Sequence, residues 1–223
     1  MMDPSSTCPK YRPEQKAIRG NCFHPSGSFI EFAKQEVEQS ITARFGKQVA
    51  LYPDRIAVKT RRHSLSYADL NREADRVAHA ILTRSFRGQQ PVALLFENGA
   101  PFVVASLGVL KAGKIQVALE SSFPRARLRY VLEQSQAATL LTDTANLSLA
   151  RQLGDLPVVN IDEVGEPFSA ANVGASVPPD GLVAVAYTSG STGEPKGMVW
   201  NHRGLLHAVM RHTNMSHMCA HDR

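Results

Sequence analysis

The segment Tyr187–Met198, with the sequence YTSGSTGEPKGM, combines glycines, hydroxyl side chains and one lysine. Glycines allow the backbone to fold closely around a ligand, and successive backbone N–H groups in such a turn can form a concave site for anions. Lys196 adds a flexible positive charge of the kind that binds phosphate. Together these groups suit a phosphate chain, and ATP is the ligand that we expect.

Eight residues of this segment are predicted to contact the nucleotide phosphates through backbone N–H groups, hydroxyl groups and the ammonium group. They are Thr188, Ser189, Gly190, Ser191, Thr192, Gly193, Lys196 and Gly197. The blander alternative is that a stretch rich in Ser, Gly and Thr is only a solvated turn. The order of the residues and the neighbouring segments favour the binding loop.

The spacing excludes better-known glycine motifs. A Walker-type loop requires Gly-Lys followed by Ser or Thr, whereas Pro195 precedes Lys196 here and Gly197 follows it. Neither the dinucleotide fingerprint G-x-G-x-x-G nor the nucleophile elbow G-x-S-x-G can be read between Gly190 and Gly197. The loop therefore belongs to another class of phosphate site.

The run from Val185 to Lys196 resembles the phosphate-binding signature of the adenylate-forming superfamily, which includes acyl-CoA synthetases, luciferases and adenylation domains of nonribosomal peptide synthetases. Three other segments resemble family segments and occur in the family's order: LSYADLN at Leu65–Asn71, LKAG at Leu110–Gly113 and WNHRGLLH at Trp200–His207. The resemblance covers roughly Phe29 to the last residue. It is closest to the adenylation domains of peptide synthetases.

The resemblance implies a reaction and its participants. Members of the superfamily use ATP to activate a carboxylic or amino acid as an acyl-adenylate, release pyrophosphate, and pass the acyl group to a thiol. The implied cofactors are ATP and Mg²⁺, and the implied acceptor is phosphopantetheine on a carrier protein, with coenzyme A as the alternative. Because the substrate carboxylate makes the attack, no catalytic residue is expected in this part of the chain.

Two departures from the family pattern limit the prediction. After LKAG the family usually continues Tyr-Val-Pro-(apolar)-Asp-Pro, whereas this chain has QVALES at Gln116–Ser121. The family's catalytic unit is also much longer and includes a C-terminal domain with a catalytic lysine. We therefore expect a partial adenylation domain, incomplete at its C-terminus and inactive alone. The second hypothesis is a non-catalytic nucleotide-binding or interaction fragment.

Composition indicates a soluble globular protein. The chain has 223 residues, of which 43% are hydrophobic, which is enough for a real core. Its 25 Lys and Arg against 20 Asp and Glu give a formal charge of +5. The basic clusters Arg61–His63 and Arg125–Arg129 accompany no recognisable nucleic-acid module, so we expect solvated faces and no nucleic-acid partner.

Cysteine usage and hydropathy point to a cytoplasmic protein without a membrane partner. Cys8, Cys22 and Cys219 are odd in number and lack C-x-x-C spacing, which fits a reducing compartment. The longest uncharged apolar stretch, Gly99–Leu110, is too short to cross a bilayer. His217, Cys219 and His221 could be read as metal ligands, but their alternation suits a strand face and implies no fourth ligand, so no metal site is predicted.

Apolar periodicity predicts an α/β fold after a proline-rich tail or linker at residues 1–28, with residues 29–223 forming the partial domain. Strands are expected at 56–58, 92–96, 139–142, 158–161 and 182–187, and helices between them. This alternation predicts a mostly parallel sheet flanked by helices, resembling the front part of the large N-terminal domain of adenylate-forming enzymes. Ligands in such folds collect at the carboxyl ends of strands, where the loop at Thr188 begins.

Local signals predict several element ends. Ser66 and Asp69 form a capping-box pattern that starts a long helix. Asn98 is expected to cap the next helix, which ends at Gly113 in a left-handed conformation. Apolar residues from Phe29 to Phe45 fall at helical spacing, and Asn201 is expected to cap a helix that starts near His202.

Overall fold

The computed structural model describes residues 12–15, 29–84, 88–165, 175–189, 195–220 and 222. It divides the chain into two compact units, residues 1–36 with 207–223, and residues 37–206. The second unit contains every strand of the described region. The predicted phosphate loop also lies within this unit, which is therefore the part that positions the candidate site.

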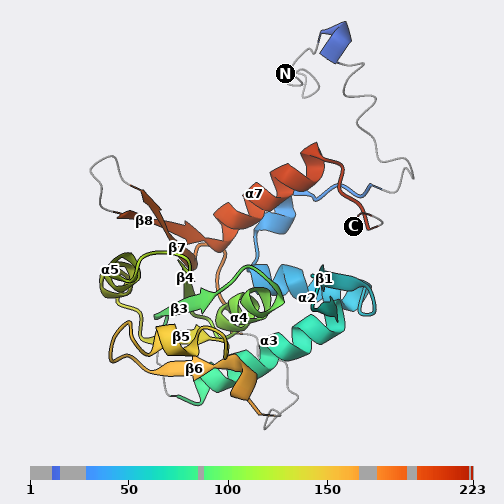
Figure 1. The fold of residues 1–223 in the computed structure, drawn as a ribbon. Coiled ribbons are helices and arrows are strands. Elements are labelled where there is room, and N and C mark those ends of the chain that lie inside the picture. Colours follow the sequence, from blue (N-terminus) through green and yellow to red (C-terminus); the bar gives the residue numbers. More distant parts are fainter. Residues whose placement is uncertain are drawn as a thin grey trace. The chain divides into compact units, whose positions relative to one another are not determined.

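A six-stranded sheet forms the centre of the larger unit (Figure 1). Its strands are β3 (Pro91–Phe96), β4 (Ile115–Glu120), β5 (Thr139–Thr142), β6 (Val158–Asn160), β7 (Leu182–Ser189) and β8 (Pro195–Asn201). The order is β6-β5-β3-β4-β7-β8, and every pair is parallel except β7 with β8. Parallel strands bring the carboxyl ends of β3, β4 and β7 to one edge, which confirms the predicted fold class.

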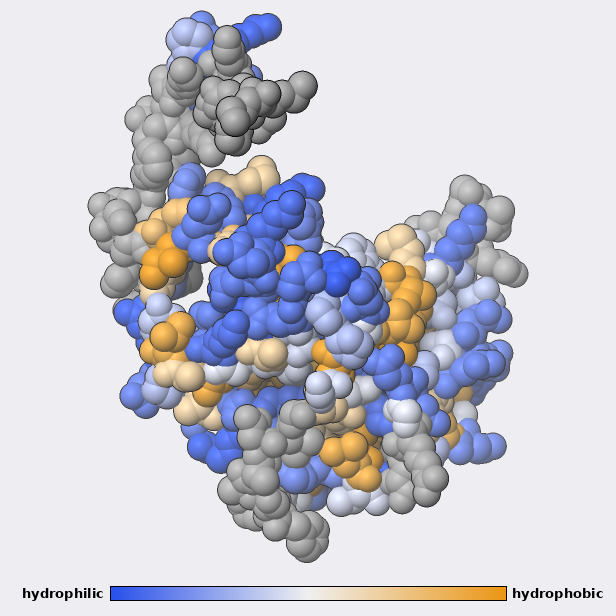
Figure 2. All heavy atoms as spheres, turned by 180° about the vertical axis from the view of Figure 1, so that it is seen from behind, coloured by the Kyte–Doolittle hydropathy of each residue, from blue (hydrophilic) through white to orange (hydrophobic). Residues whose placement is uncertain are grey.

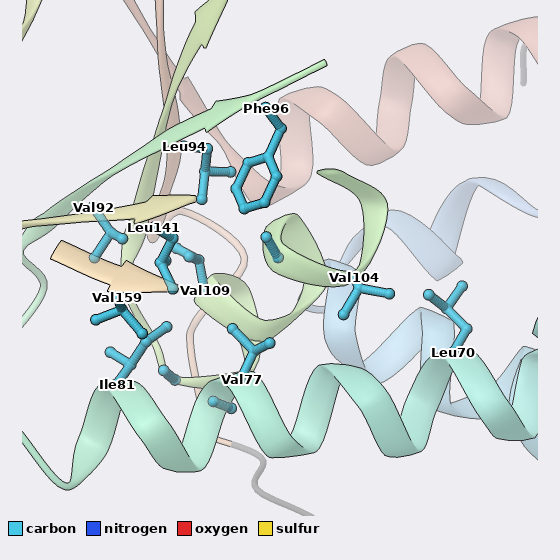
Figure 3. Close-up of a cluster of buried hydrophobic side chains, with 13 residues drawn as sticks. Leu70, Val77, Ile81, Val92, Leu94, Phe96, Val104, Val109, Leu141 and Val159 are labelled. Carbon is cyan, nitrogen blue, oxygen red and sulfur yellow. The ribbon is translucent and has the colours of Figure 1, made fainter. Parts of the chain in front are cut away.

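Helices cover both faces of this sheet, because successive side chains along β3 point to opposite faces and the apolar residues on both faces must be buried. Val92, Leu94 and Phe96 belong to the cluster that contains α3 (Tyr67–Leu82) and α4 (Ala100–Lys111). Ala93 and Leu95 belong to the opposite cluster, with α5 (Arg125–Ser135) and the short helix α6 (Leu147–Ala150). Figure 3 shows Val77 and Ile81 of α3 directed toward Val109 of α4 and the sheet residues Val92 and Val159.

Helices α3 and α4 cross closely because one crossing residue lacks a side chain. A Cβ atom placed on Gly108 would lie 2.6 Å from the Cβ atom of Val77 and 3.0 Å from the carbonyl oxygen of Ala74. Contacts of that length between such atoms are not tolerated without a shift of the helices. Gly108 therefore sets the distance between the two helices on this face.

A buried charged network links the same two helices. The Nζ atom of Lys111, in the LKAG segment, lies 2.7 Å from Oδ1 of Asp75 and 2.8 Å from Oδ1 of Asn71. Asn71 in turn donates to Oδ2 of Asp75 at 3.0 Å. Because the Lys111 side chain is only 4% exposed, its charge requires these partners. The lysine of this segment therefore has a structural role.

A small hairpin precedes α3. Strands β1 (Ile56–Lys59) and β2 (Ser64–Ser66) pair antiparallel, and α3 begins directly after them. The predicted capping box is confirmed, since Ser66 Oγ accepts from the Asp69 N–H at 3.0 Å and the Ser66 N–H donates to Asp69 Oδ2 at 3.3 Å. The Ser66 hydroxyl also donates to Asp69 Oδ2 at 2.8 Å, and this hydrogen bond, followed by the one from Arg72, lowers the pKa of Asp69.

The helical spacing from Phe29 to Phe45 does not produce one helix. The structure has a short 3₁₀ helix, η1 (Lys34–Val37), and a separate helix, α2 (Ile41–Leu51). Ser40 separates them because its extended backbone and its hydroxyl, which accepts from the Ala43 N–H at 3.1 Å, make it the cap of α2.

Two other expected element ends differ in detail. Helix α4 is preceded by Gly99 rather than capped by Asn98, and Pro101 lies in its first turn, where a missing N–H costs nothing. Gly113 has the predicted left-handed conformation, with φ of 68°. At the end of β6, the residues Ile161–Glu163 form the short 3₁₀ helix η2 instead of continuing the strand.

Helix α7 (His202–Met215) follows β8, and the Gly204 N–H donates to Asn201 Oδ1 at 2.7 Å, which confirms the predicted cap. In the smaller unit, Asn214 holds the backbone of Phe32, accepting from its N–H at 2.9 Å and donating to its carbonyl oxygen at 3.0 Å. Within the described residues, no helix is both long enough and apolar enough to span a bilayer.

Candidate functional site

The predicted phosphate loop connects β7 to β8. Thr188 and Lys196 are opposite each other in the antiparallel ladder, and both are exposed. Directly opposite residues in such a ladder project from the same face, so the Thr188 and Lys196 side chains share one face of the hairpin. Ser189 and Pro195 form the next pair and close the ladder. Gly190, Ser191, Thr192 and Gly193 lie outside the described residues, and their phosphate contacts stay predictions.

Gly197 lies inside β8 rather than in a loop. Its ladder partner is Tyr187, and a Cβ atom at position 197 would lie 3.4 Å from the Tyr187 ring and 3.3 Å from Val185 Cγ1. The contact with Val185 is tighter than ordinary van der Waals packing, and the contact with the ring lies at its lower limit. The absence of a side chain at Gly197 therefore leaves room for the Val185 and Tyr187 side chains, and the predicted phosphate contact of this residue stays a prediction.

An open hollow of about 780 Å³ lies beside this hairpin. It is lined at the carboxyl ends of three strands, by Phe96 of β3, by Ala118–Glu120 of β4, and by Ala186 and Tyr187 of β7. Tyr187 directly precedes Thr188, so the hollow and the first residue of the predicted phosphate site are adjacent along β7. This is the edge at which ligands bind in open parallel sheets.

The lining of the hollow mixes aromatic, amide and acidic groups. Phe102 and Phe123 join Phe96 and Tyr187, while Glu97, Asn98, Ser122 and Asn146 are among its polar lining residues. Ser122 Oγ donates to Glu120 Oε1 at 3.0 Å, and the Arg127 guanidinium lies 4.1 Å from the centre of the Phe123 ring. Burial, with a smaller contribution from Tyr130, raises the pKa of Tyr187, so its hydroxyl stays protonated at neutral pH.

Sequence analysis missed strand β4, which supplies Ala118, Leu119 and Glu120 to this lining. The segment Gln116–Ser121 was interpreted only as an altered family motif, yet Ile115–Glu120 is a strand between β3 and β7. Ile115, Val117 and Leu119 are buried at alternate positions, and that period of two was a usable signal. The Gln116 side chain accepts a hydrogen bond from Ser106 on α4, so this departure from the family pattern is accommodated.

His202, predicted as a helix-start residue, is almost fully buried, with 1% of its surface exposed. Its Nδ1 atom accepts a hydrogen bond from the Ile41 N–H, at the start of α2, at 3.1 Å. Burial lowers the pKa of this histidine, which favours the neutral ring that the hydrogen bond requires. His202 therefore links the start of α7 to α2.

The described residues contain no group of three or more His, Cys, Asp or Glu side chains placed to hold a metal ion. Of the residues considered as ligands in the sequence, His221 lies outside the described part of the chain. Phe29 packs edge-on against His217, with ring centres 4.8 Å apart.

Comparison with known proteins identifies the family of this site. A family model described as "AMP-binding enzyme" matches residues 45–223. Tyrocidine synthase 1 of Brevibacillus parabrevis is 35% identical over 184 residues, which cover 77% of this chain and 17% of the synthase. Phosphinothricin tripeptide synthetase PhsC of Streptomyces viridochromogenes is 36% identical over 161 residues, covering 69% of this chain and 14% of the synthetase.

Solved structures agree with the sequence matches. The nonribosomal peptide synthetase FmoA3, in its alpha-methyl-L-serine-AMP bound form, superposes with a TM-score of 0.72 and 28% identity, over 81% of this chain and 21% of its own. A fatty acid AMP ligase from Legionella pneumophila shares the fold, with a TM-score of 0.74 and 22% identity, over 81% of this chain and 33% of its own. The chain thus spans a third or less of each of these relatives. It belongs to the AMP-binding enzyme family, the adenylate-forming superfamily that its phosphate loop resembles.

Proposed function

We propose that the β7–β8 hairpin and its turn bind the β- and γ-phosphates of ATP in an enzyme that activates a carboxylic or amino acid as an acyl-adenylate. The observation that carries this proposal is the pairing of Thr188 with Lys196, beside the hollow at the carboxyl edge of the sheet. A cationic and a hydroxyl donor on one face suit adjacent phosphate oxygens. FmoA3, which has the same fold, was solved with AMPPNP bound, and this supports the assignment.

In the proposed reaction the substrate carboxylate oxygen attacks the α-phosphorus of ATP. The new P–O bond forms as the bond to pyrophosphate breaks, so negative charge grows on the leaving group. Lys196 and the loop hydroxyl groups stabilise that charge, which is electrostatic stabilisation by donors already in place. The protein supplies no nucleophile. Mg²⁺, implied by the family, would accompany the triphosphate.

The acyl group then passes to a thiol in this proposal. Phosphopantetheine on a carrier protein is the first candidate, because FmoA3 is a nonribosomal peptide synthetase. Coenzyme A is the second candidate. The 223-residue chain covers 17% of tyrocidine synthase 1, and we propose that alone it binds nucleotide without completing the reaction.

Calorimetric titration with ATP tests the binding step. Lys196→Ala is expected to weaken ATP binding about tenfold, since one charge-assisted hydrogen bond is lost. Lys59→Ala is the matched control, because Lys59 is also an exposed strand lysine but lies in β1, in the separate two-stranded sheet. Its ATP affinity should equal that of the unmodified chain. Absent ATP binding, or equal weakening in both variants, would contradict the proposed site.

A second assay separates binding from chemistry. Carboxylate-dependent ATP–pyrophosphate exchange by the isolated chain is expected to match a no-enzyme control with a broad panel of amino and fatty acids. Exchange above that control would show that the chain alone is catalytic. That result would contradict the proposal that the isolated chain is inactive, but it would not contradict the proposed nucleotide site.

A further inference from the structure

Strand β8 presents an unusually open edge. It is the last strand of the sheet, and none of the described strands pairs with its outer edge. Met198, Val199 and Trp200 are 44%, 59% and 38% exposed. They are among the large exposed apolar residues of a surface on which orange patches interrupt the hydrophilic blue (Figure 2). An unpaired edge of this kind is a template for another strand.

The usual devices that protect an edge strand are weak in β8. Charged side chains, internal prolines and bulges are the common ones. Here Lys196 is the one charged residue, and Pro195 is the first residue of the strand rather than an interior one. The ladder with β7 is regular from Ala184 and Trp200 to the end of the strand. The edge is therefore competent to form a further ladder.

The sequence of β8, PKGMVWN, is complementary to itself in antiparallel pairing. With Met198 as the central residue, all seven positions pair. Lys196 then faces Trp200 of the other copy, and Gly197 faces Val199. A lysine beside a tryptophan ring makes a favourable cation–π contact, and no like charges are opposed. Pro195 faces Asn201 at the ends of the ladder, where a missing N–H is tolerated.

We propose that two copies of this chain associate by antiparallel β8–β8 pairing, with Met198 on the two-fold axis. The partner is a second copy rather than an unrelated strand, because Lys196 and Trp200 lie at equal distances in sequence from Met198. Two-fold pairing about Met198 therefore places the lysine of each copy opposite the tryptophan of the other. Symmetric pairing of one patch with itself is the commonest arrangement of soluble dimers. One seven-residue ladder is smaller than a standard interface, so the association is weak, in the micromolar range or above.

Lys196 is also the proposed phosphate-binding lysine, so the association is tested without ATP. Sedimentation velocity of the full chain, from low micromolar to several hundred micromolar, should show a monomer–dimer equilibrium. Met198→Lys and Met198→Glu each place like charges opposite each other across the axis and should raise the dimer dissociation constant at least about tenfold. An equimolar mixture of the two variants should form a heterodimer, because the charges are then opposite.

Leu51→Lys is the matched control. Leu51 is 64% exposed and ends helix α2, so the same gain of charge lies away from the β8 edge and should leave dimerisation unchanged. A monomer at every concentration would overturn the proposal. So would a dimer that persists in Met198→Lys, or a mixture of the two variants that stays monomeric while circular dichroism shows both folded.

Discussion

Replacing Asp75 by Asn tests the buried network between α3 and α4. The substitution keeps the shape of the side chain and removes the charge that lies 2.7 Å from Lys111 Nζ. Lys111 and Asp75 side chains are 4% and 13% exposed, so water screens this pair poorly. Removing one partner of a buried ion pair costs about 3–5 kcal/mol. Because Asn71 still accepts from Lys111, we expect the lower end, about 3 kcal/mol.

A double-mutant cycle isolates the interaction. Lys111→Met removes the ammonium but keeps most of the apolar stem, and should also cost about 3 kcal/mol of unfolding free energy, because it too removes one partner of the buried pair. The double variant removes both charges, so it should lose less stability than the sum of the two single variants. The coupling between Asp75 and Lys111 should therefore be favourable and larger than about 1 kcal/mol.

Thermal and urea unfolding of the full chain measure these values. For a protein of this size, about 3 kcal/mol corresponds to a fall in Tm of roughly 6–12 °C in Asp75→Asn. Urea unfolding should give a lower midpoint with an unchanged slope, which indicates a change in stability rather than in compactness. A Tm equal to that of the unmodified chain, or strictly additive effects, would refute the buried-pair reasoning.

Gly108→Ala should destabilise the protein by about 1–3 kcal/mol, because its Cβ would lie 2.6 Å from Val77. Gly46→Ala, whose Cβ would have no atom within 4 Å, should instead stabilise helix α2 by about 0.5–1 kcal/mol. Chemical unfolding compares the two variants, and equal effects on the unfolding free energy would contradict the packing argument. Burial lowers the pKa of His202, so its contribution to stability should be complete above the unfolded histidine pKa, about 6.5, and be lost as the pH falls from there through the folded pKa. Tm measured from pH 7.5 to pH 5 should fall less steeply in His202→Asn, whose amide oxygen can still accept from Ile41; an unchanged slope would argue against this role. In a longer enzyme that contains this chain, Lys196→Ala should reduce turnover about a hundredfold or more, and ATP affinity less, because the ammonium group matters most as pyrophosphate separates. Single-turnover kinetics and a separate measurement of ATP binding test this, and near-normal turnover in the variant would contradict it.

The parallel core could be predicted from the sequence because its strands and helices carry strong local signals. The apolar run at Val92–Phe96 and the capping box at Ser66 each point to one structure, and both are confirmed. Strand β4 was missed because the polar Gln116 and the acidic Glu120 interrupt its apolar run, which leaves the alternation of Ile115, Val117 and Leu119 as its signal.

Strand β8 was missed for a different reason. Its residues read as the end of a glycine-rich loop, and nothing local predicts that Gly197 is extended and paired with Tyr187. That pairing depends on β7, which is held in the sheet by its parallel ladder with β4. The proposal of a phosphate site rests on the residue types of the loop alone, whereas the hollow beside it depends on three strands that are distant in sequence.

Hydrogen–deuterium exchange with and without ATP tests most directly whether the β7–β8 hairpin is the triphosphate site. ATP is predicted to slow exchange of the backbone amides in residues 186–200, and adenosine, which lacks phosphates, is predicted to leave them unchanged. The same protection should be lost in Lys196→Ala. Equal protection by adenosine and ATP, or ATP protection confined to other segments while the hairpin exchanges freely, would contradict the account.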